Sequence, residues 1–497
     1  MGIVKKQAYK NTIIQYAGMV IAYVNTVLLF PFFATSAQYG FYTLVISISV
    51  LYSLIASLGV PGILLRYFPF YRTDDKRHNG FIYWTVVVSL LGFLLATVVY
   101  VVLKPIILSA YQGTSPLYQR YYYYLIPMSF FVIVFNYLEM TGRIVYITIY
   151  SNFLQSILLR LLTTVFLVMM AYKWINFQDF IFLYIGSNGL MALLMLISII
   201  ASGQFSLRVD KLSFKTIEQR AILNFGLFTV ISTSIYVLLQ KIDTLMLSAM
   251  VGDSIQGVYS WYFNIAMVIG VSAQALSRTT YPIVSNAWKT KDMDSISQVY
   301  SKTSIIQMVI GCLLLIGIIV NRQNLYAIVH NKQYTDPKYF SIFIVVGLGF
   351  LVDITGGLNA YIISSSHKYK LFLLFSAGSV GVCVLMNYLL IPKYHGLGSA
   401  LAYLVTLVLL NFATWFYIKY RFKLQPFRVK HLWVIMIAAV SFLVGYYFWK
   451  MPIVPLDIIV RSGITALIYG ALIYIFHISE DVNEKIDQTF VKLRLKK

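Results

Sequence analysis

Residues 240–286 read QKIDTLMLSAMVGDSIQGVYSWYFNIAMVIGVSAQALSRTTYPIVSN. This stretch places Lys241 and Asp243 inside an apolar helix, follows it with a tight turn at 251–257, and ends a second apolar helix with Arg278 shortly before Pro282. A charge near the centre of a bilayer costs about 3 kcal/mol or more, so it normally faces a cavity or a partner. The three charges therefore mark this stretch as one that needs a structural or functional explanation.

The composition around it is that of an all-α polytopic membrane protein. Of 497 residues, 59% are hydrophobic and 11% charged, with a mean hydropathy of +0.77; a soluble chain has about a quarter of its residues charged. The net charge of +22 does not indicate a nucleic-acid partner, because Lys and Arg lie mostly between the apolar blocks. Cys312 and Cys383 fall within apolar blocks and are interpreted as core residues.

Fourteen apolar segments are long enough to cross a bilayer, which takes about 20 residues. They are 12–33, 41–64, 81–103, 121–141, 147–171, 179–200, 221–249, 258–283, 303–320, 339–366, 371–391, 397–418, 432–449 and 457–477.

The distribution of basic residues supports this count. With the N-terminus in the cytoplasm, the inside segments carry 27 Lys plus Arg and the outside loops carry 8. The remaining four of the 39, Arg160, Lys241, Arg278 and Arg461, lie inside spans. Because positive charge favours the cytoplasmic side, we predict a multi-pass protein with both termini in the cytoplasm.

A weak internal repeat divides the chain. Gly40-Phe41-Tyr42 and Gly257-Val258-Tyr259 share a Gly-x-Tyr core, lie 217 residues apart, and each opens the second helix of a half. Six helices per half is an even number, so both halves enter from one side, and such parallel repeats place substrate between them. The predicted parts are an N-terminal six-helix lobe at 1–209, a cytoplasmic connector at 210–220, a C-terminal six-helix lobe at 221–420, two additional transmembrane helices at 421–477 and a cytoplasmic tail at 478–497.

Several charged residues inside spans are candidates for function. Arg160 lies mid-span and either serves function or pairs with a neighbouring helix carbonyl or with Glu139. Lys241 and Asp243 are two residues apart and so point about 200° apart around one helix. Asp243 facing inward would bind a cation, whereas Lys241 either functions or snorkels towards the interface.

Arg66 and Arg278 each lie near the inner end of the second helix of a half. They either snorkel to headgroups or together clamp a phosphate group, for which a guanidinium is well suited.

Two further acidic residues lie in spans. Asp353 is a candidate cation site or hinge residue, because Gly356 and Gly357 just after it would loosen the helix. Asp457 and Arg461 could simply pair with each other. No catalytic residues, metal ligands or enzyme motifs are predicted, since neither a Gly-Lys-Ser/Thr phosphate loop nor a His-Glu-x-x-His pattern occurs.

The opening stretch resembles the polysaccharide flippases of the O-antigen type, within the multidrug/oligosaccharidyl-lipid/polysaccharide exporter superfamily. Their seventh helix carries an Asp and an apolar run, followed by a short turn, Gly-x-Tyr and a helix closing at Pro. The matching residues here are Asp243, Gly257, Tyr259 and Pro282. The resemblance extends over essentially the whole chain, because the helix count, the division into halves and the predicted cytoplasmic position of both termini also match.

The resemblance implies two six-helix lobes around a V-shaped cavity. It also implies export of an undecaprenyl-diphosphate-linked oligosaccharide (O-antigen, capsule or exopolysaccharide repeat unit) from the inner to the outer leaflet of a bacterial plasma membrane. Arg66, Arg160, Lys241 and Arg278 would form a cationic lumen, while Asp243 and Asp353 would serve a coupling Na⁺ or H⁺. The expected partners are the lipid-linked substrate, membrane lipids and glycan polymerase or other assembly proteins, with no other cofactor and no nucleic acid.

Two other functions remain open from the sequence. A multidrug or cation antiporter on the same fold would usually have an essential acid in helix one, and residues 12–33 contain none. A membrane glycosyltransferase or O-antigen polymerase should show a catalytic acid in an early external loop or a large external loop with arginines. Residues 34–40 have no acid, and the longest external loop is 321–338.

Overall fold

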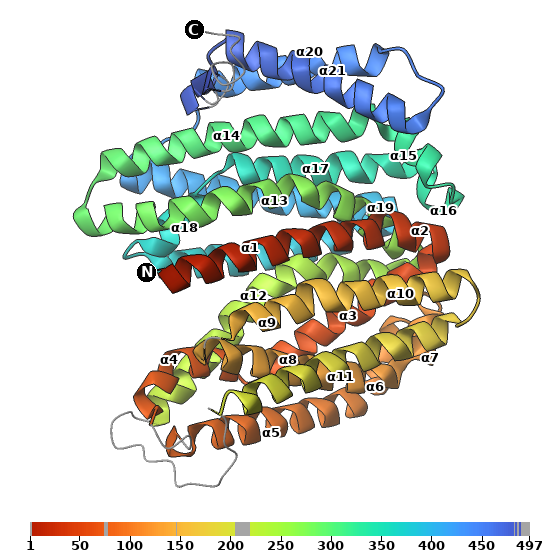
Figure 1. Cartoon of the computed structure of the whole chain (residues 1–497), viewed down its shortest axis with the longest axis vertical. Coiled ribbons are helices and arrows are strands. Elements are labelled where there is room, and N and C mark those ends of the chain that lie inside the picture. The colour runs from red at the N-terminus through yellow and green to blue at the C-terminus, as the bar shows by residue number, and fades with distance from the viewer. Residues whose placement is uncertain are drawn as a thin grey trace. The chain divides into compact units, whose positions relative to one another are not determined.

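The computed structural model describes residues 2–73, 78–145, 147–203, 219–481, 483–484 and 487–488, and within them every regular element is helical. They form two compact units, Met1–Ser260 and Trp261–Lys497, with α13 passing from the first into the second (Figure 1). The elements of the first unit are α1 (Gly2–Tyr23), η1 (Val24–Leu29), α2 (Phe30–Phe33), α3 (Ser36–Ala56), α4 (Val60–Tyr71), η2 (His78–Gly80), α5 (Phe81–Val102), α6 (Lys104–Ala110), α7 (Pro116–Arg120), η3 (Tyr122–Tyr124), α8 (Leu125–Ile144), α9 (Thr148–Phe153), η4 (Leu154–Leu158), α10 (Leu159–Ala171), α11 (Phe177–Ala201), α12 (Gln219–Met250) and the start of α13 (Asp253–Thr290). Those that follow are α14 (Met293–Val320), α15 (Arg322–Ile328), α16 (Lys332–Thr335), η5 (Pro337–Tyr339), α17 (Phe340–Thr355), α18 (Asn359–Ser365), α19 (Tyr369–Phe422), α20 (Val429–Tyr447) and α21 (Val454–Ile475).

The helices confirm the predicted all-α membrane fold. Within the described residues, 12 helical segments are long and apolar enough to cross a membrane. One of these, Lys370–Phe422, has 53 residues and leaves the helical region at His395 (φ 51°, ψ −125°). It therefore comprises two helices, which match the predicted spans 371–391 and 397–418. α13, which is not one of the 12, has 38 residues and covers the predicted span 258–283.

The second predicted span, residues 41–64, is divided in the structure. α3 begins with a capping box in which Thr35 and Gln38 satisfy each other's backbone N–H groups. It ends before a turn in which Gly59 has φ 76°, and α4 continues from there. A Cβ on Gly59 would lie 2.3 Å from the carbonyl oxygen of Gly226 in α12, so only glycine fits where these backbones meet.

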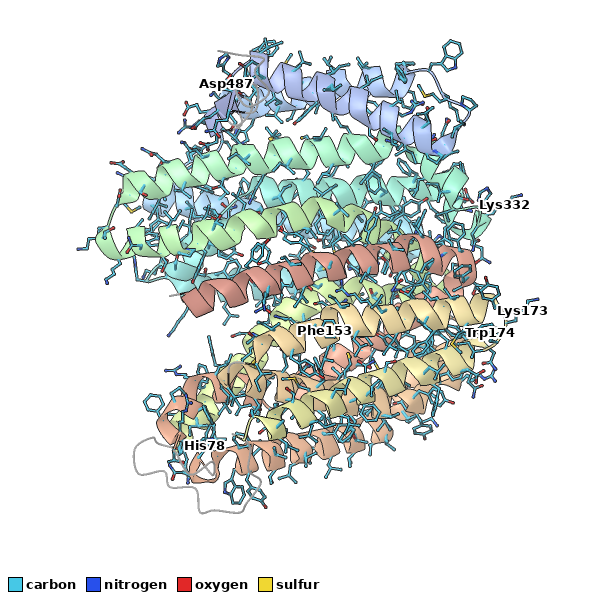
Figure 2. All side chains as sticks on the ribbon, viewed as in Figure 1. His78, Phe153, Lys173, Trp174, Lys332 and Asp487 are labelled. Atoms are coloured by element: carbon cyan, nitrogen blue, oxygen red, sulfur yellow. The ribbon has the colours of Figure 1, made fainter. Side chains whose placement is uncertain are left out.

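The first unit buries a core beneath α4, α5, α8 and α11, with Leu64, Ile82 and Met195 almost fully enclosed. Figure 2 shows His78 at one end of this unit and Lys173 with Trp174 at the other. These residues belong to loops that the predicted topology puts on opposite sides of the membrane. Trp174 is exposed, as expected for an aromatic side chain at a membrane interface.

The second unit contains α14, α17 and α19, with α20 and α21 packed beside α14 (Figure 1). The predicted span 339–366 is also divided here, into α17 and α18, and Gly357 takes φ 65° at the break. The break confirms the prediction that the two glycines loosen this helix. The predicted domain boundaries stay a prediction, and most of the connector 210–220 and of the tail 478–497 lies outside the described residues.

Candidate functional site

Arg160 lies in α10, and its side chain contacts α1. Its guanidinium Nη1 donates a hydrogen bond to the carbonyl oxygen of Gly18 in α1. Its own carbonyl accepts from the side-chain amide of Asn25 at 2.8 Å, and the Thr164 hydroxyl donates to the same Asn25 side chain at 2.7 Å. Of the two alternatives for pairing, the structure shows the helix carbonyl, because Glu139 forms its ion pair with Arg143 at 2.6 Å.

Two tyrosines from other helices lie close enough to Arg160 to interact with it electrostatically, Tyr42 of α3 and Tyr184 of α11. Their rings meet edge to face with centroids 5.0 Å apart. Among the described residues no carboxylate forms an ion pair with Arg160. A cation lined by phenol groups and without an acidic partner is suited to an anionic or sugar-bearing ligand.

Asp243 lies in α12 and is 3% exposed. Its carboxylate accepts a 2.9 Å hydrogen bond from the hydroxyl of Tyr259 in α13. Tyr259 is the tyrosine of the second Gly-x-Tyr copy, so the repeat and the buried acid meet at one place. Lys241, two residues before Asp243, is only partly buried and so has a different environment on the same helix.

The two arginines predicted to form a phosphate clamp are not brought together by anything that the structure describes. Arg66 is exposed on α4, with its guanidinium 4.3 Å from the ring centroid of Phe225. The side chain of Arg278 lies outside the described set. The clamp stays a prediction.

Asp353 lies two residues before the end of α17, beside the break that separates it from α18, and is exposed. Three polar groups form a chain of hydrogen bonds towards it. The hydroxyl of Tyr300 donates to Asn359, the Asn359 amide donates to Asn411 at 3.2 Å, and the Asn411 amide donates to Asp353 at 3.0 Å. All three donors point in one direction, so the Asn411 amide holds the Asp353 carboxyl in place beside the helix break.

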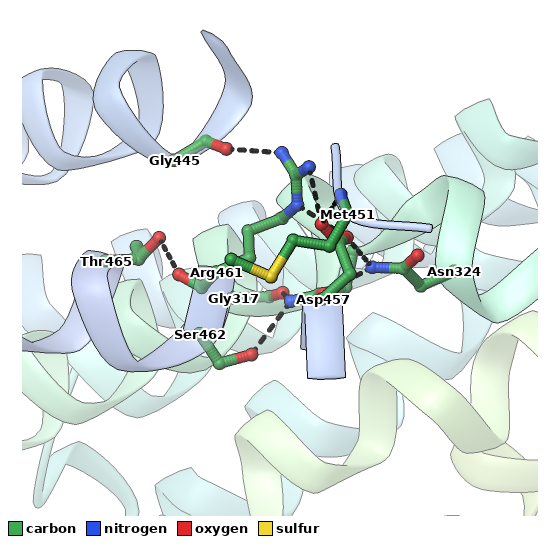
Figure 3. Close-up of polar contacts among 9 residues, drawn as sticks. Gly317, Asn324, Gly445, Met451, Asp457, Arg461, Ser462 and Thr465 are labelled. Carbon is green, nitrogen blue, oxygen red and sulfur yellow. Dashed lines mark hydrogen bonds and ion pairs between the residues drawn. The ribbon is translucent and has the colours of Figure 1, made fainter. Parts of the chain in front are cut away.

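Asp457 and Arg461 form a buried ion pair, as considered from their spacing, with Nε to Oδ2 at 3.0 Å (Figure 3). Arg461 also donates to the carbonyl of Gly445 at 2.8 Å, while Asp457 accepts from the Asn324 amide and from the backbone N–H of Met451. Every member of this cluster has a partner, so its role is to join α15, α20 and α21.

Asp253 is a buried acid that is not among the residues predicted from the sequence, because an Asp at a helix start resembles an ordinary cap. It is 3% exposed, and its two carboxylate oxygens accept from Ser115 and Ser248, both at 2.5 Å. Nothing in the local sequence identifies these serines as its partners. As for metals, no group of three or more His, Cys, Asp or Glu within the described residues is placed to hold an ion.

Comparison with known proteins identifies the family of this chain and the fold that it shares with solved structures. A family model described as polysaccharide biosynthesis protein matches residues 4–288, more than half of the chain. No curated protein matches the sequence. The structure is similar to the lipid II flippase MurJ in an inward closed conformation, with a TM-score of 0.76, 14% identity, and coverage of 94% of this chain and 98% of that one.

It is also similar to a multidrug resistance MATE family transporter of the MOP superfamily. The TM-score is 0.60 against the inward-facing conformation, covering 82% of this chain and 94% of that one, and 0.55 against the outward-facing conformation, covering 84% and 96%. Both are 12% identical to this chain. At such identities the likeness shows a shared fold.

Proposed function

Because the chain belongs to the family of polysaccharide biosynthesis proteins, we propose that it is a flippase for an undecaprenyl-diphosphate-linked oligosaccharide. It carries the O-antigen, capsule or exopolysaccharide repeat unit from the inner to the outer leaflet of a bacterial plasma membrane by alternating access. The observation that carries this proposal is the family match over residues 4–288 on a membrane fold of the MOP type. The family match and the membrane fold together indicate a transporter and not an enzyme.

The arrangement around Arg160 supports an anionic substrate. A guanidinium has five N–H donors, and within the described part of the chain the hydrogen bond to Gly18 involves Nη1. The remaining donors suit a diphosphate or an acidic sugar. Arg66, Lys241 and Arg278 complete the proposed cationic lining.

Coupling to an ion gradient is proposed at two acids. Asp243 is buried and has a phenol donor, while Asp353 is exposed at a helix break. Discontinuous helices in transporters commonly form ion sites, because the break leaves backbone and side-chain oxygens exposed to the pathway. Na⁺ or H⁺ is the proposed coupling ion.

Deleting the gene should abolish the surface polysaccharide and cause lipid-linked glycan to accumulate in the inner leaflet. The measurement is quantification of both glycans in the deletion strain and in a strain complemented with the wild-type gene. Normal surface glycan in a deletion strain with no redundant flippase would contradict the proposal.

Arg160→Ala should lower export at least about tenfold, and Arg160→Lys should retain more of it, because a lost hydrogen bond to a charged group costs about 1.5–3 kcal/mol. Lysine keeps the charge but loses the planar fork. Surface polysaccharide per unit of membrane-inserted protein measures the effect. Arg143→Ala, which breaks a helix-surface ion pair with Glu139, is the matched control and should export normally. Wild-type export by both Arg160 variants would remove this residue from the substrate site.

The second candidate function is drug or cation export on the same fold, which the likeness to the MATE family transporter favours. It predicts drug sensitivity in the deletion strain with surface glycan unchanged. The lack of an acid in residues 12–33 argues against it, since helix one of the drug-exporting relatives usually carries one.

A further inference from the structure

The break between α17 and α18 is held on both sides by side chains of α14. The hydroxyl of Ser304 donates a hydrogen bond at 2.7 Å to the carbonyl oxygen of Thr355, the last residue of α17. One turn earlier on the same face of α14, the hydroxyl of Tyr300 donates to Asn359, the first residue of α18. Both donors are fully buried. α14 therefore fixes the end of one helix and the start of the next, around the turn at Gly357.

His431 of α20 contacts the same Ser304 hydroxyl. Its Nε2 lies 3.0 Å from the Ser304 oxygen, and His431 is 6% exposed. Ser304 has one hydroxyl proton and the Thr355 carbonyl can only accept, so Nε2 must carry the proton in the contact between His431 and Ser304. The other ring nitrogen, Nδ1, accepts the backbone N–H of Arg428 at 3.1 Å. The imidazole is thereby fixed at the start of α20 and directs the Ser304 proton towards the helix break.

Asp353 lies in the helical turn that this hydrogen bond holds. It is two residues before Thr355, so a shift of the Thr355 carbonyl moves the backbone that carries the carboxyl group. From the other side of the break, Asn359 reaches the same carboxyl group through Asn411. Both routes start on α14, and the route through Thr355 continues to α20 by way of His431.

We propose that His431 is a positioning residue for Asp353, an inference that rests on the proposed coupling role of Asp353. By donating to Ser304 it holds the last turn of α17, and with it the Asp353 carboxyl group, in the orientation that binds the coupling ion. α20 is one of the two predicted additional helices, so that helix pair takes part in coupling as well as in packing. A purely structural His431 would only attach α20 to α14.

Chemical modification of Asp353 tests the positioning without reference to any substrate. Full-length protein in detergent is treated with dicyclohexylcarbodiimide, which modifies carboxyl groups in apolar surroundings, and the modified peptide is quantified by mass spectrometry. His431→Phe removes the donor to Ser304 and loosens the last turn of α17, so it should raise the rate of modification about threefold to tenfold. Asp353→Asn gives the background signal. An unchanged or lower rate in His431→Phe would overturn the proposal.

A conservative variant separates the hydrogen bond from the shape of the ring. The amide of glutamine can still donate to Ser304, so His431→Gln should stay within about twofold of the wild-type rate. Ser304→Ala, which keeps the imidazole but removes the hydroxyl, should reproduce the effect of His431→Phe. The double variant should be no faster than either single one, because both changes act on one path. A rate in His431→Gln as high as in His431→Phe would exclude the hydrogen-bonded role.

Tyr469→Phe is the matched control. The hydroxyl of Tyr469 in α21 donates to the carbonyl oxygen of Val309 in α14 at 3.0 Å, so its loss also weakens the attachment of the additional helices, but away from the break. Thermal denaturation in detergent should show similar losses of stability in Tyr469→Phe and His431→Phe, whereas only His431→Phe should speed the modification of Asp353. Equal acceleration in both would show general loosening and overturn the proposal. If His431→Phe does not fold, the smaller change Ser304→Ala tests the same path.

Export provides the link to transport. His431→Phe should lower surface polysaccharide per inserted protein about threefold to tenfold, and His431→Gln should export close to the wild-type level. Wild-type export by folded His431→Phe protein would overturn the role in coupling. Failure of coupling at Asp353 looks different, because Asp353→Asn would then export like the wild type, while the modification rates would still report whether His431 holds the carboxyl group in place.

Discussion

Asp457→Ala is expected to lower the free energy of unfolding by about 3–5 kcal/mol, the usual cost of leaving a buried charge without its partner. Asp457 is 1% exposed and Arg461 6% exposed, so water cannot replace the lost carboxylate in the folded protein. The change also removes the acceptor for Asn324 of α15 and for the backbone N–H of Met451. Unfolding in detergent, followed by thermal denaturation or by titration with a denaturing detergent, measures the loss.

A double variant, Asp457→Leu with Arg461→Met, is the matched control. Apolar replacement of both partners of a buried pair is often neutral or stabilising, so the double variant should recover most of the stability lost in the single one. Lys338→Ala, which breaks an exposed ion pair with Asp336 and leaves the Asp336 cap of η5 in place, should change stability very little. A single variant as stable as the wild type would show that the cluster does not join α15, α20 and α21 as described.

Asp243→Asn is expected to lower export by about tenfold to a hundredfold while the protein stays folded. Asparagine has nearly the shape of aspartate and can still accept the hydrogen bond from Tyr259, so the main change is the loss of negative charge. A coupling ion held by that charge would lose an interaction worth about 1.5–3 kcal/mol. Tyr259→Phe keeps the charge and removes only the phenol donor, and should cost less.

Two measurements check this expectation. Surface polysaccharide per inserted protein gives the loss of export, and its remaining sensitivity to an ionophore shows whether coupling persists. Asp179→Asn is the control, because Asp179 is an exposed capping residue of α11. If Asp243→Asn exports like wild type and still stops when the ion gradient collapses, Asp243 is not the coupling site.

Much of the fold was predictable because its signals are local. A span is recognised from about 20 consecutive apolar residues, and the helices were found where these blocks occur. The helix break after Asp353 was predictable from Gly356 and Gly357. The Asp457–Arg461 pair was also predictable as an option, since residues four apart on a helix are neighbours.

The candidate site was less predictable because its partners lie far apart in the chain. Arg160 and Gly18 are separated by 142 residues, and Ser115 and Asp253 by 138. Which carbonyl or hydroxyl meets a buried charge depends on the rotation and depth of two packed helices. Neither quantity is encoded in a single segment.

The amino-acid sequence by itself determined the class of the protein and its helical spans, and it predicts two related halves. These follow from hydropathy, from the side preference of Lys and Arg, and from the repeated Gly-x-Tyr. Only the tertiary structure showed that Gly40 and Gly257 each contact the start of the helix that carries the other copy. It also showed that the hydroxyl of Tyr259 donates a hydrogen bond to Asp243. The physical reason is that a glycine in the sequence indicates only that another backbone comes close, whereas the packing of the helices determines which backbone it is.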